Sequence, residues 1–244
     1  MLEQSIQADP VRTLTIIVPI LNELNGIENL VSHLAQVGAE QVIIVDGGSA
    51  DGSLTWLKKH WEDRDDGRIA MQAPAGRALQ MNAGVWLASS DIILFLHSDS
   101  RLPRGAKLEV LAARERQNIW GRFDIEFSGH TGSRWSMRVI ALLINIRSRL
   151  TSIATGDQAI FVDRGIFKKV GGYPKIQLME DVALSKTLKR QGVPHCSALK
   201  VRTSARRWEQ GGVIKTVLLM WYFRLAYFLG ASPKRLADQY RQTR

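Results

Sequence analysis

The most informative stretch of this chain is Ile92–Ser100, with the sequence IILFLHSDS. The residues from Ile92 to Leu96 are all large and apolar, which is typical of a strand buried on both faces of a parallel sheet. In open α/β sheets, ligands bind just outside the carboxyl ends of the strands. Because Asp99 follows this strand, we expect its carboxylate to lie where a metal ion or a diphosphate can be held.

Similar apolar runs alternate with helical patterns through the N-terminal part of the chain. The runs predict further strands at 14–18, 41–45 and 69–72, and helices follow at about 23–37, from Ser53 and at about 77–88. This βαβα order predicts an α/β fold with a mainly parallel, Rossmann-like central sheet flanked by helices. Right-handed crossovers then follow from the twist of the strands.

The second half is less regular. We predict strands at 120–127 and 159–162, helical spacing from Trp135 to Leu150, and a helix at 180–191. The segment 213–229 is rich in large apolar side chains but contains Lys215 and Arg224. A helix packed on the core is our interpretation, and an interfacial helix with basic side chains reaching outward is the alternative.

No internal repeat or linker divides the chain, so we expect one domain over residues 1–244. Within it, a nucleotide-binding half covers about 12–100, an acceptor or catalytic half covers about 101–210, and a basic C-terminal helical region covers about 211–244. The lone Cys196 excludes an intramolecular disulfide. Because residues 1–10 lack a signal-peptide pattern and no run is long enough to span a membrane, we expect a cytoplasmic protein.

Charge is concentrated near the C-terminus. The formal net charge is +10, and residues 200–244 hold ten Lys or Arg against two acids. Such a surface attracts nucleic acid, anionic lipid or a phosphorylated substrate, or is a solvated face without a partner. No nucleic-acid module is recognisable, so we expect no nucleic-acid partner. Peripheral contact with the inner face of the membrane through this basic region stays open.

Polar residues follow the first two predicted strands. Asp46 ends the second strand and precedes Gly47, and such a carboxylate can accept a hydrogen bond from a base imide or a ribose hydroxyl. The alternative is an Asp that only shapes a turn. Pro19, Asn22 and Glu23 follow the first strand and can line the same crevice, although Asn22 also fits a helix cap.

Two cationic or titratable residues stand near the later strands. Arg77, near a helix start, can pair with a phosphate through its planar fork or lie on the surface. His97 shares a side with Asp99 if the strand continues, and it can then bind Mn²⁺ or donate a hydrogen bond to phosphate. A purely structural histidine is the alternative. A divalent ion would assist the departure of a diphosphate.

Adjacent acids begin the predicted helix at 180–191. Glu180 and Asp181 are stabilised there by the helix dipole, so capping is one interpretation. The other is a general base, because a carboxylate can accept the proton of an attacking hydroxyl. Two neighbouring acids raise one another's pKa when both are desolvated. Spacing alone does not say which of the two acts.

Taken in order, these motifs resemble family 2 glycosyltransferases. The resemblance runs over nearly the whole chain and rests on the segments 18–23, 45–53, 76–84, 95–100 and 180–181. The segments 156–162 and 171–181 are similar to those of a small bacterial subgroup. The resemblance implies a GT-A fold, an inverting mechanism, a nucleotide-sugar donor that is commonly a UDP-sugar, and a hydroxyl acceptor.

The resemblance also implies roles for particular residues. Asp46 would contact the base, and Asp181 would match the catalytic base, with Glu180 beside it. Asp99 would match the last acid of a metal-binding Asp-x-Asp motif, which implies Mn²⁺ or Mg²⁺ as the cofactor. The implied donor-binding residues are Pro19, Asn22, Glu23, Asp46, Gly47, Arg77, His97, Ser98 and Asp99.

Two departures from the family pattern stand out. His97 occupies the position of the first acid of Asp-x-Asp, which bears on metal binding. Ser204 replaces the Gln of the Gln-x-x-Arg-Trp motif of processive members, so we expect no processive polymer synthesis. The predicted contacts to the acceptor or diphosphate are Gly156, Asp157, Arg207 and Trp208.

Two other functions are compatible with parts of this pattern. A nucleotidyltransferase can share a similar α/β core, but it usually carries a Gly-rich and basic signature that residues 18–23 lack. A non-enzymatic binder of nucleic acid or of a membrane surface would explain the basic C-terminal region. Its affinity would fall steeply with salt and would need no sugar nucleotide.

Overall fold

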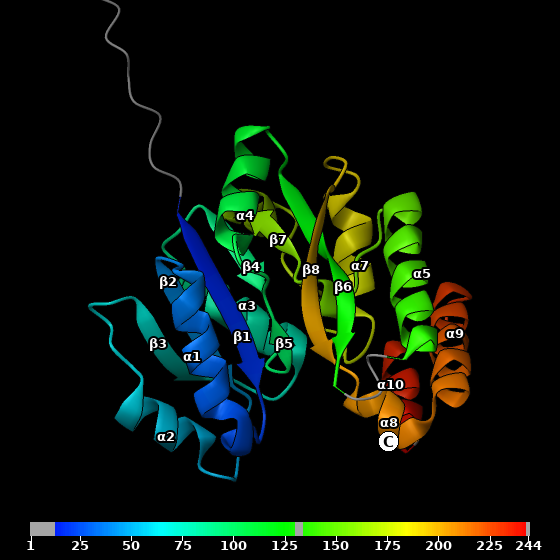
Figure 1. The fold of residues 1–244 in the computed structure, drawn as a ribbon, viewed down its shortest axis with the longest axis horizontal. Helices are drawn as coiled ribbons and strands as arrows, with labels where there is room; N and C mark the ends of the chain where they lie inside the picture. Colours follow the sequence, from blue (N-terminus) through cyan, green and yellow to red (C-terminus); the bar gives the residue numbers. More distant parts are fainter. Residues whose placement is uncertain (1–12, 130–133, 243–244) are drawn as a thin grey trace, which may run out of the picture.

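The computed structural model describes residues 13–129 and 134–242 (Figure 1). Strands in this part of the chain form a mixed sheet in the order β3-β2-β1-β4-β7-β6-β8-β5. Their bounds are β1 Leu14–Ile20, β2 Gln41–Asp46, β3 Arg68–Gln72, β4 Ile92–Phe95, β5 Ser100–Arg101, β6 Trp120–Ser128, β7 Phe161–Asp163 and β8 His195–Ser204.

Helices cover both faces of this sheet. The bounds of the α-helices are α1 Ile27–Val37, α2 Ser53–His60, α3 Arg77–Leu87, α4 Ala106–Glu115, α5 Trp135–Thr151, α6 Arg164–Lys169, α7 Glu180–Leu188, α8 Arg206–Gly211, α9 Val213–Phe228 and α10 Pro233–Gln242. Two short 3₁₀ turns are η1 Leu24–Gly26 and η3 Gly156–Gln158. None of the described helices is long and apolar enough to cross a membrane.

Strand direction changes in the middle of the sheet. β1 pairs in parallel with β2 and β4, and β2 pairs in parallel with β3. β7 then runs antiparallel to β4 and β6, whereas β6 and β8 are parallel to each other. The predicted α/β class with a central sheet flanked by helices is therefore confirmed. The parallel part carries the N-terminal half of the chain.

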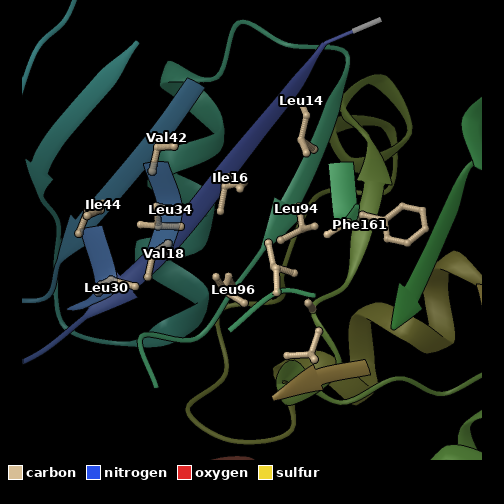
Figure 2. Packing of buried hydrophobic residues seen from close by; sticks show 14 of the residues in the cluster. Leu14, Ile16, Val18, Leu30, Leu34, Val42, Ile44, Leu94, Leu96 and Phe161 are labelled. Carbon is tan, nitrogen blue, oxygen red and sulfur yellow. The ribbon is translucent and has the colours of Figure 1, made fainter. Parts of the chain in front are cut away.

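Apolar strand residues alternate between two cores. On one face, Ile16 and Val18 of β1 pack with Leu30 and Leu34 of α1 (Figure 2). On the other, Ile17 packs in a cluster with residues of α3 and α7. Every residue of β1, β2 and β4 is buried, which explains why these strands have continuous apolar sequences rather than alternating ones.

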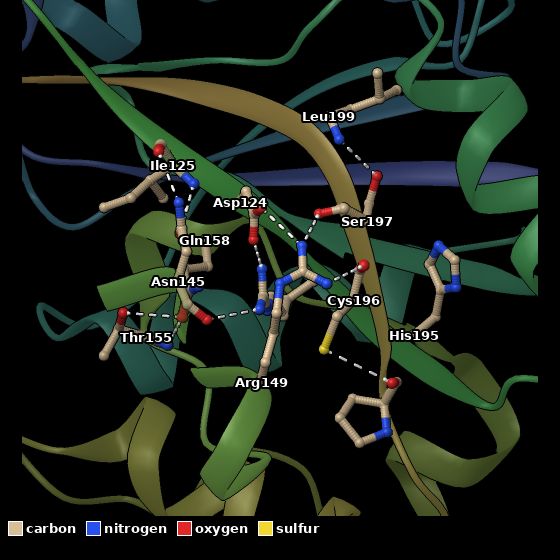
Figure 3. Close-up of polar contacts among 12 residues, drawn as sticks. Asp124, Ile125, Asn145, Arg149, Thr155, Gln158, His195, Cys196, Ser197 and Leu199 are labelled. Atoms are coloured by element: carbon tan, nitrogen blue, oxygen red, sulfur yellow. Dashed lines mark hydrogen bonds and ion pairs between the residues drawn. The ribbon is translucent and has the colours of Figure 1, made fainter. Parts of the chain in front are cut away.

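Helix α5 is fastened to the part of β6 that lies beyond its pairing with β7. That pairing covers only Trp120 and Gly121. Farther along, Asn145 of α5 accepts a hydrogen bond from Ile125 N at 2.9 Å and donates one to Ile125 O at 3.1 Å (Figure 3). The Asn145 amide thus satisfies both backbone groups of one residue on a strand edge, as a neighbouring strand would.

Candidate active site

The predicted donor residues gather at the carboxyl ends of β1, β2 and β4. Asn22 lies in the loop after β1, where Asn22 N donates to Ser49 Oγ at 2.8 Å and Asn22 Oδ1 accepts from Ala50 N at 2.9 Å. Asn22 is not the N-cap of α1, because that position is Gly26. Its side chain instead ties the β1–α1 loop to the β2–α2 loop. Pro19 is buried in β1 opposite Val45.

Asp46 ends β2 with an exposed fraction of only 1%. Its Oδ1 accepts hydrogen bonds from Gly48 N at 2.7 Å and Ser49 N at 2.8 Å, as a turn-shaping Asp does. Its Oδ2 is buried and has no hydrogen-bond partner in the described part of the chain. Buried carboxylate oxygens normally have partners, so this atom is available to a donor group on a ligand.

Gln80 of α3 connects the ends of β1 and β2 next to Asp46. Its Nε2 donates to the carbonyl oxygens of Ile20 and Val45, both at 2.8 Å. A Cβ on Gly47 would lie 3.0 Å from the Gln80 amide, so the Gly47 backbone and this side chain are in close contact. The ends of β1 and β2 are therefore held at a fixed spacing around the Asp46 carboxylate.

A small cavity of about 150 Å³ lies beside the loop that follows β1. Glu23, Ser98, Asp99 and Arg101 line it, and Ser98 Oγ donates to Glu23 Oε1 at 2.8 Å. Arg101 Nη1 donates to the carbonyl oxygens of Ser98 and Ser100, both at 2.9 Å. Burial lowers the pKa of Arg101, while the Asp99 and Glu23 carboxylates raise it. Arg101 had no signal in the sequence beyond its place after Asp99.

His97 and Asp99 do not continue a strand, so the condition for their sharing a side fails. β4 ends at Phe95, and residues 98–99 form a turn closed by a bond from Ser100 N to His97 O at 3.1 Å. Asp99 is exposed and lines the cavity with Glu23, whereas His97 lies against Gly156. The described residues contain no group of three or more His, Cys, Asp or Glu that could hold a metal ion.

Gly156 and His97 approach each other closely. A Cβ on Gly156 would lie 2.5 Å from His97 Nε2, so any larger residue here would force the ring or the backbone to move. Burial, and then the positive charge of Arg77, lower the pKa of His97 to about 3. The imidazole is therefore neutral at neutral pH. Arg77 is exposed at the first position of α3, and its charge acts on His97 and Glu180 alike.

The acidic pair begins α7 directly beside Gly156. Asp181 Oδ2 accepts a hydrogen bond from Gly156 N at 2.8 Å, and Oδ1 accepts one from Val182 N at 2.7 Å. Burial raises the pKa of Asp181, and Asp157 raises it further. Burial, and then the Asp181 charge, raise the pKa of Glu180 to about 7. The start of α7 is thus close to the residues that flank it in this site, which are Arg77, His97 and Gly156.

Two arginines near Asp181 were not among the predicted site residues. Arg147 comes from α5 and Arg224 from α9, and burial followed by the Arg224 charge lowers the pKa of Arg147 to about 10. Arg147 Nε, Arg147 Nη2 and Asp157 Oδ1 are buried without hydrogen-bond partners in the described residues. In the sequence, Arg147 and Arg224 each stand within an apolar helical pattern. The spacing of such a pattern does not assign an Arg to a site.

Trp208 has a packing role. Its side chain is buried, and its ring lies 5.4 Å from that of Phe127 in an edge-on arrangement, in a cluster with Met137. It is not open to an acceptor or a diphosphate in this structure. The side chain of Arg207, which was predicted to act with it, lies outside the described residues.

Comparison with known proteins places this geometry in context. The family model described as glycosyl transferase family 2 matches residues 15–171. Poly-beta-1,6-N-acetyl-D-glucosamine synthase of Staphylococcus aureus is 24% identical over 252 residues, covering 96% of this chain and 58% of the relative. The chain therefore spans little more than half of that relative. An uncharacterized glycosyltransferase of Mycobacterium tuberculosis is 31% identical over 98 residues, covering 36% of this chain and 34% of its own length.

Solved structures share the fold at low sequence identity. The mannosyltransferase PcManGT from Pyrobaculum calidifontis, in complex with GDP-Man and Mn²⁺, superposes with a TM-score of 0.62 at 17% identity, covering 93% of this chain and 68% of its own. TarS residues 1–349 of S. aureus give a TM-score of 0.60 at 17% identity, covering 79% of this chain and 60% of that one.

Proposed function

This chain belongs to glycosyl transferase family 2, and from that membership we propose that it moves a sugar from a UDP-sugar to an acceptor hydroxyl with inversion at the anomeric carbon. The observation that carries the proposal is the half-buried Asp181 carboxylate, held by Gly156 N beside Arg77 and His97. A partly desolvated base next to cationic and neutral hydrogen-bonding groups suits the transfer of a group from a diphosphate.

The base of the donor would bind at Asp46. Its Oδ2 is buried, lacks a partner in the described residues, and can accept the imide N–H of uracil. Asn22, Glu23 and Gly47 would form the walls of this pocket, with Pro19 behind them. We assign this part of the site to the nucleotide-binding half of the chain, about residues 12–100.

The diphosphate would lie between Arg77 and the turn that follows β4. The Arg77 guanidinium can pair with phosphate oxygens, and neutral His97 can donate one hydrogen bond to them. Mn²⁺ or Mg²⁺, when bound, supplies positive charge to the leaving diphosphate. Exposed Asp99 fits such an ion as its carboxylate ligand, because these cations often take one or two carboxylates and complete their shell with substrate phosphates. PcManGT was solved with Mn²⁺.

The transfer itself would be carried out at Asp181. The carboxylate accepts the proton of the acceptor hydroxyl as its oxygen forms a bond to the anomeric carbon. The bond between that carbon and the diphosphate oxygen breaks, and the nucleoside diphosphate leaves with the electron pair. Asp157, with Arg147 and Arg224 nearby, would line the acceptor side. We propose a single transfer rather than processive synthesis, because Ser204 stands where processive members have Gln.

Calorimetry tests the donor site first. We expect UDP and UDP-sugars to bind in the presence of Mn²⁺ or Mg²⁺, and GDP to bind more weakly. Asp46→Asn keeps an acceptor for Gly48 and Ser49 but replaces the free oxygen, so UDP affinity should fall about tenfold or more. The matched control is Asp91→Asn, at the opposite end of β4. Equal UDP binding by both variants would contradict the assignment of Asp46.

Metal and base have separate tests. Asp99→Ala should remove the difference in UDP affinity between Mn²⁺ and EDTA, and an unchanged difference would exclude Asp99 as the ligand.

Asp181→Asn should lower turnover by about 10²-fold or more while UDP affinity stays near that of the wild type. Turnover like that of the wild type would exclude Asp181 as the base.

A further inference from the structure

Helices α5 and α9 lie side by side at the C-terminal edge of the molecule (Figure 1). They pack through Met137 and Ile140 of α5 and through Val217 and Met220 of α9. The opposite face of each helix is apolar and exposed. On α5 this exposed stripe consists of Trp135, Val139, Leu142, Leu143, Ile146 and Leu150.

Helix α9 repeats the arrangement. Trp221 is 72% exposed and Phe228 is 75% exposed, although both are large apolar side chains. The exposed stripe of α9 and its C-cap consists of Leu218, Trp221, Tyr222, Leu225, Phe228 and Leu229. Surface helices of globular proteins normally have one apolar stripe, which faces the core, so both helices carry a second apolar stripe that the core does not cover.

These two stripes hold most of the exposed large apolar side chains. They account for twelve of the eighteen among the described residues. A contiguous patch of this kind marks a site of interaction, whereas single exposed apolar residues need no explanation. We call the patch the α5–α9 face.

The charge around the α5–α9 face is positive. The sequences of α5 and α9 contain no Asp or Glu. Their exposed cationic residues are Arg138, Arg149 and Lys215, whereas Arg147 and Arg224 are half-buried. A bilayer of anionic phospholipid offers the matching surface, because apolar side chains enter the acyl boundary while Lys and Arg reach the headgroups.

A groove of about 690 Å³ lies between α5 and the strands β6 and β8, away from Asp181 and Asp46. Leu142 and Ile146 of the α5–α9 face form part of its lining. Its cationic lining residues are Arg138, Arg149, Lys200 and Arg202.

The acids of this groove are already paired. Asp124 forms ion pairs with Arg122 and with Arg149, the latter at 2.7 Å (Figure 3). Glu126 accepts a hydrogen bond from Arg202 Nε at 2.7 Å. The groove therefore has a net excess of cationic side chains next to the apolar stripe, which suits lipid phosphates.

We propose that the α5–α9 face docks on a bilayer that contains anionic phospholipid, with lipid phosphates in the adjoining groove. A second copy of the chain is a poorer occupant, because a two-fold interface sets each patch against itself and brings like charges together. The docking goes beyond the sugar transfer and does not depend on it. Since Arg147 and Arg224 come from the same two helices, the bilayer would lie near Asp181 and the acceptor side.

Vesicle flotation of the full chain tests the docking. We expect it to float with vesicles of phosphatidylcholine and phosphatidylglycerol in equal parts, and much less with phosphatidylcholine alone. Trp221→Ala should weaken the binding about tenfold or more, because a large aromatic surface no longer enters the bilayer. Trp86→Ala is the matched control, since Trp86 is 82% exposed on α3.

Charge is tested separately from apolar contact. Lys200→Gln should weaken binding to the anionic vesicles about fivefold, because one basic residue near such a surface contributes about 1 kcal/mol. Lys58→Gln, on α2, should bind like the wild type. Raising the salt concentration should reduce binding of the wild type and reduce this difference.

Three results would overturn the proposal. The chain fails to float with anionic vesicles, or Trp221→Ala floats as well as Trp86→Ala. The third is a dimer in sedimentation that Leu143→Glu dissociates and Leu108→Glu does not, which would assign the face to a second copy. Leu143 and Leu108 are both exposed on helices, and circular dichroism of each variant confirms that it is folded.

Discussion

The charges on either side of Asp181 provide a test of its role. Asp157 raises the pKa of Asp181, and Arg224 lowers it. A general base works only when it is deprotonated, so turnover falls as the pH drops below its pKa. Asp157→Asn should therefore move the acid limb of the rate profile to lower pH, and Arg224→Gln should move it to higher pH.

The measurement is kcat against pH for the two variants and the wild type, at saturating donor and acceptor. If these residues acted on folding alone, the substitutions would change the maximal kcat but not the pH at which the acid limb falls. Limbs that move in the same direction, or that do not move, would count against Asp181 as the titrating base.

Glu180 links the site to stability. Its pKa is raised from 4.5 to about 7, so the folded state disfavours the ionised carboxylate. Its neutral form is favourable to folding at low pH, and that contribution is lost as the pH rises through the window from 4.5 to about 7. At pH 8 Glu180→Gln should be more stable than the wild type by about 1 kcal/mol or more, which corresponds to about 2–4 °C in Tm.

Thermal unfolding of Glu180→Gln at several pH values measures this effect. The gain in Tm should shrink as the pH approaches 4.5, the ordinary pKa of the group. Glu115→Gln, on the exposed surface of α4, is the control. A gain that is equal at all pH values would show that the substitution acts through packing rather than through ionisation.

At the level of elements, α3 approaches the sheet closely at one glycine. A Cβ on Gly84 would lie 2.6 Å from Ile17 Cγ2 and 3.2 Å from Val45 Cγ2. Gly84→Ala should therefore separate α3 from β1 and β2 and destabilise the fold by about 1–3 kcal/mol. Gly26→Ala is the control, because a Cβ there meets nothing within 4 Å. Urea unfolding midpoints compare the two, and equal midpoints would contradict the close contact.

The parallel part of the sheet could be predicted because its strands are buried on both faces. β1, β2 and β4 are continuous apolar runs, and glycines or caps mark the helices between them. β8 was not predicted, since its residues are mainly half-buried or exposed and its sequence lacks an apolar period. Helices α4, α6 and α8 and the short β5 were also missed, whereas α5 and α9 were found and α10 lies within the helical region predicted for about 211–244.

The candidate site was predictable as a set of loops but not as a set of contacts. The carboxyl ends of parallel strands meet at one edge, which brings Asp46, Glu23 and Asp99 together. The approach of Gly156 to His97 depends on the packing of η3 against the end of β4, and no local pattern encodes that approach. Arg147 and Arg224 were unpredictable as site residues for the same reason.

For the whole molecule, the proposed site would lie where the two predicted halves of the chain meet. Asp46 and Arg77 come from the parallel half, and Asp181 comes from the half with mixed strands. A bound nucleotide would contact several loops that are joined to one another by hydrogen bonds, such as those from Ala50 N to Asn22 Oδ1 and from Ser98 Oγ to Glu23 Oε1. Ligand binding should therefore stabilise the complete fold rather than a single element.

Nucleotide binding at this junction should raise the unfolding temperature of the whole chain in one step. A ligand that binds only the folded state at about 100 times its Kd adds about 2.7 kcal/mol. For a chain of this size, this corresponds to an increase in Tm of about 5–10 °C. UDP with Mn²⁺ should produce that increase in scanning calorimetry, EDTA should reduce it, and Asp46→Asn should remove most of it. If UDP split the transition in two, the halves would unfold independently, and a site shared between them would be excluded.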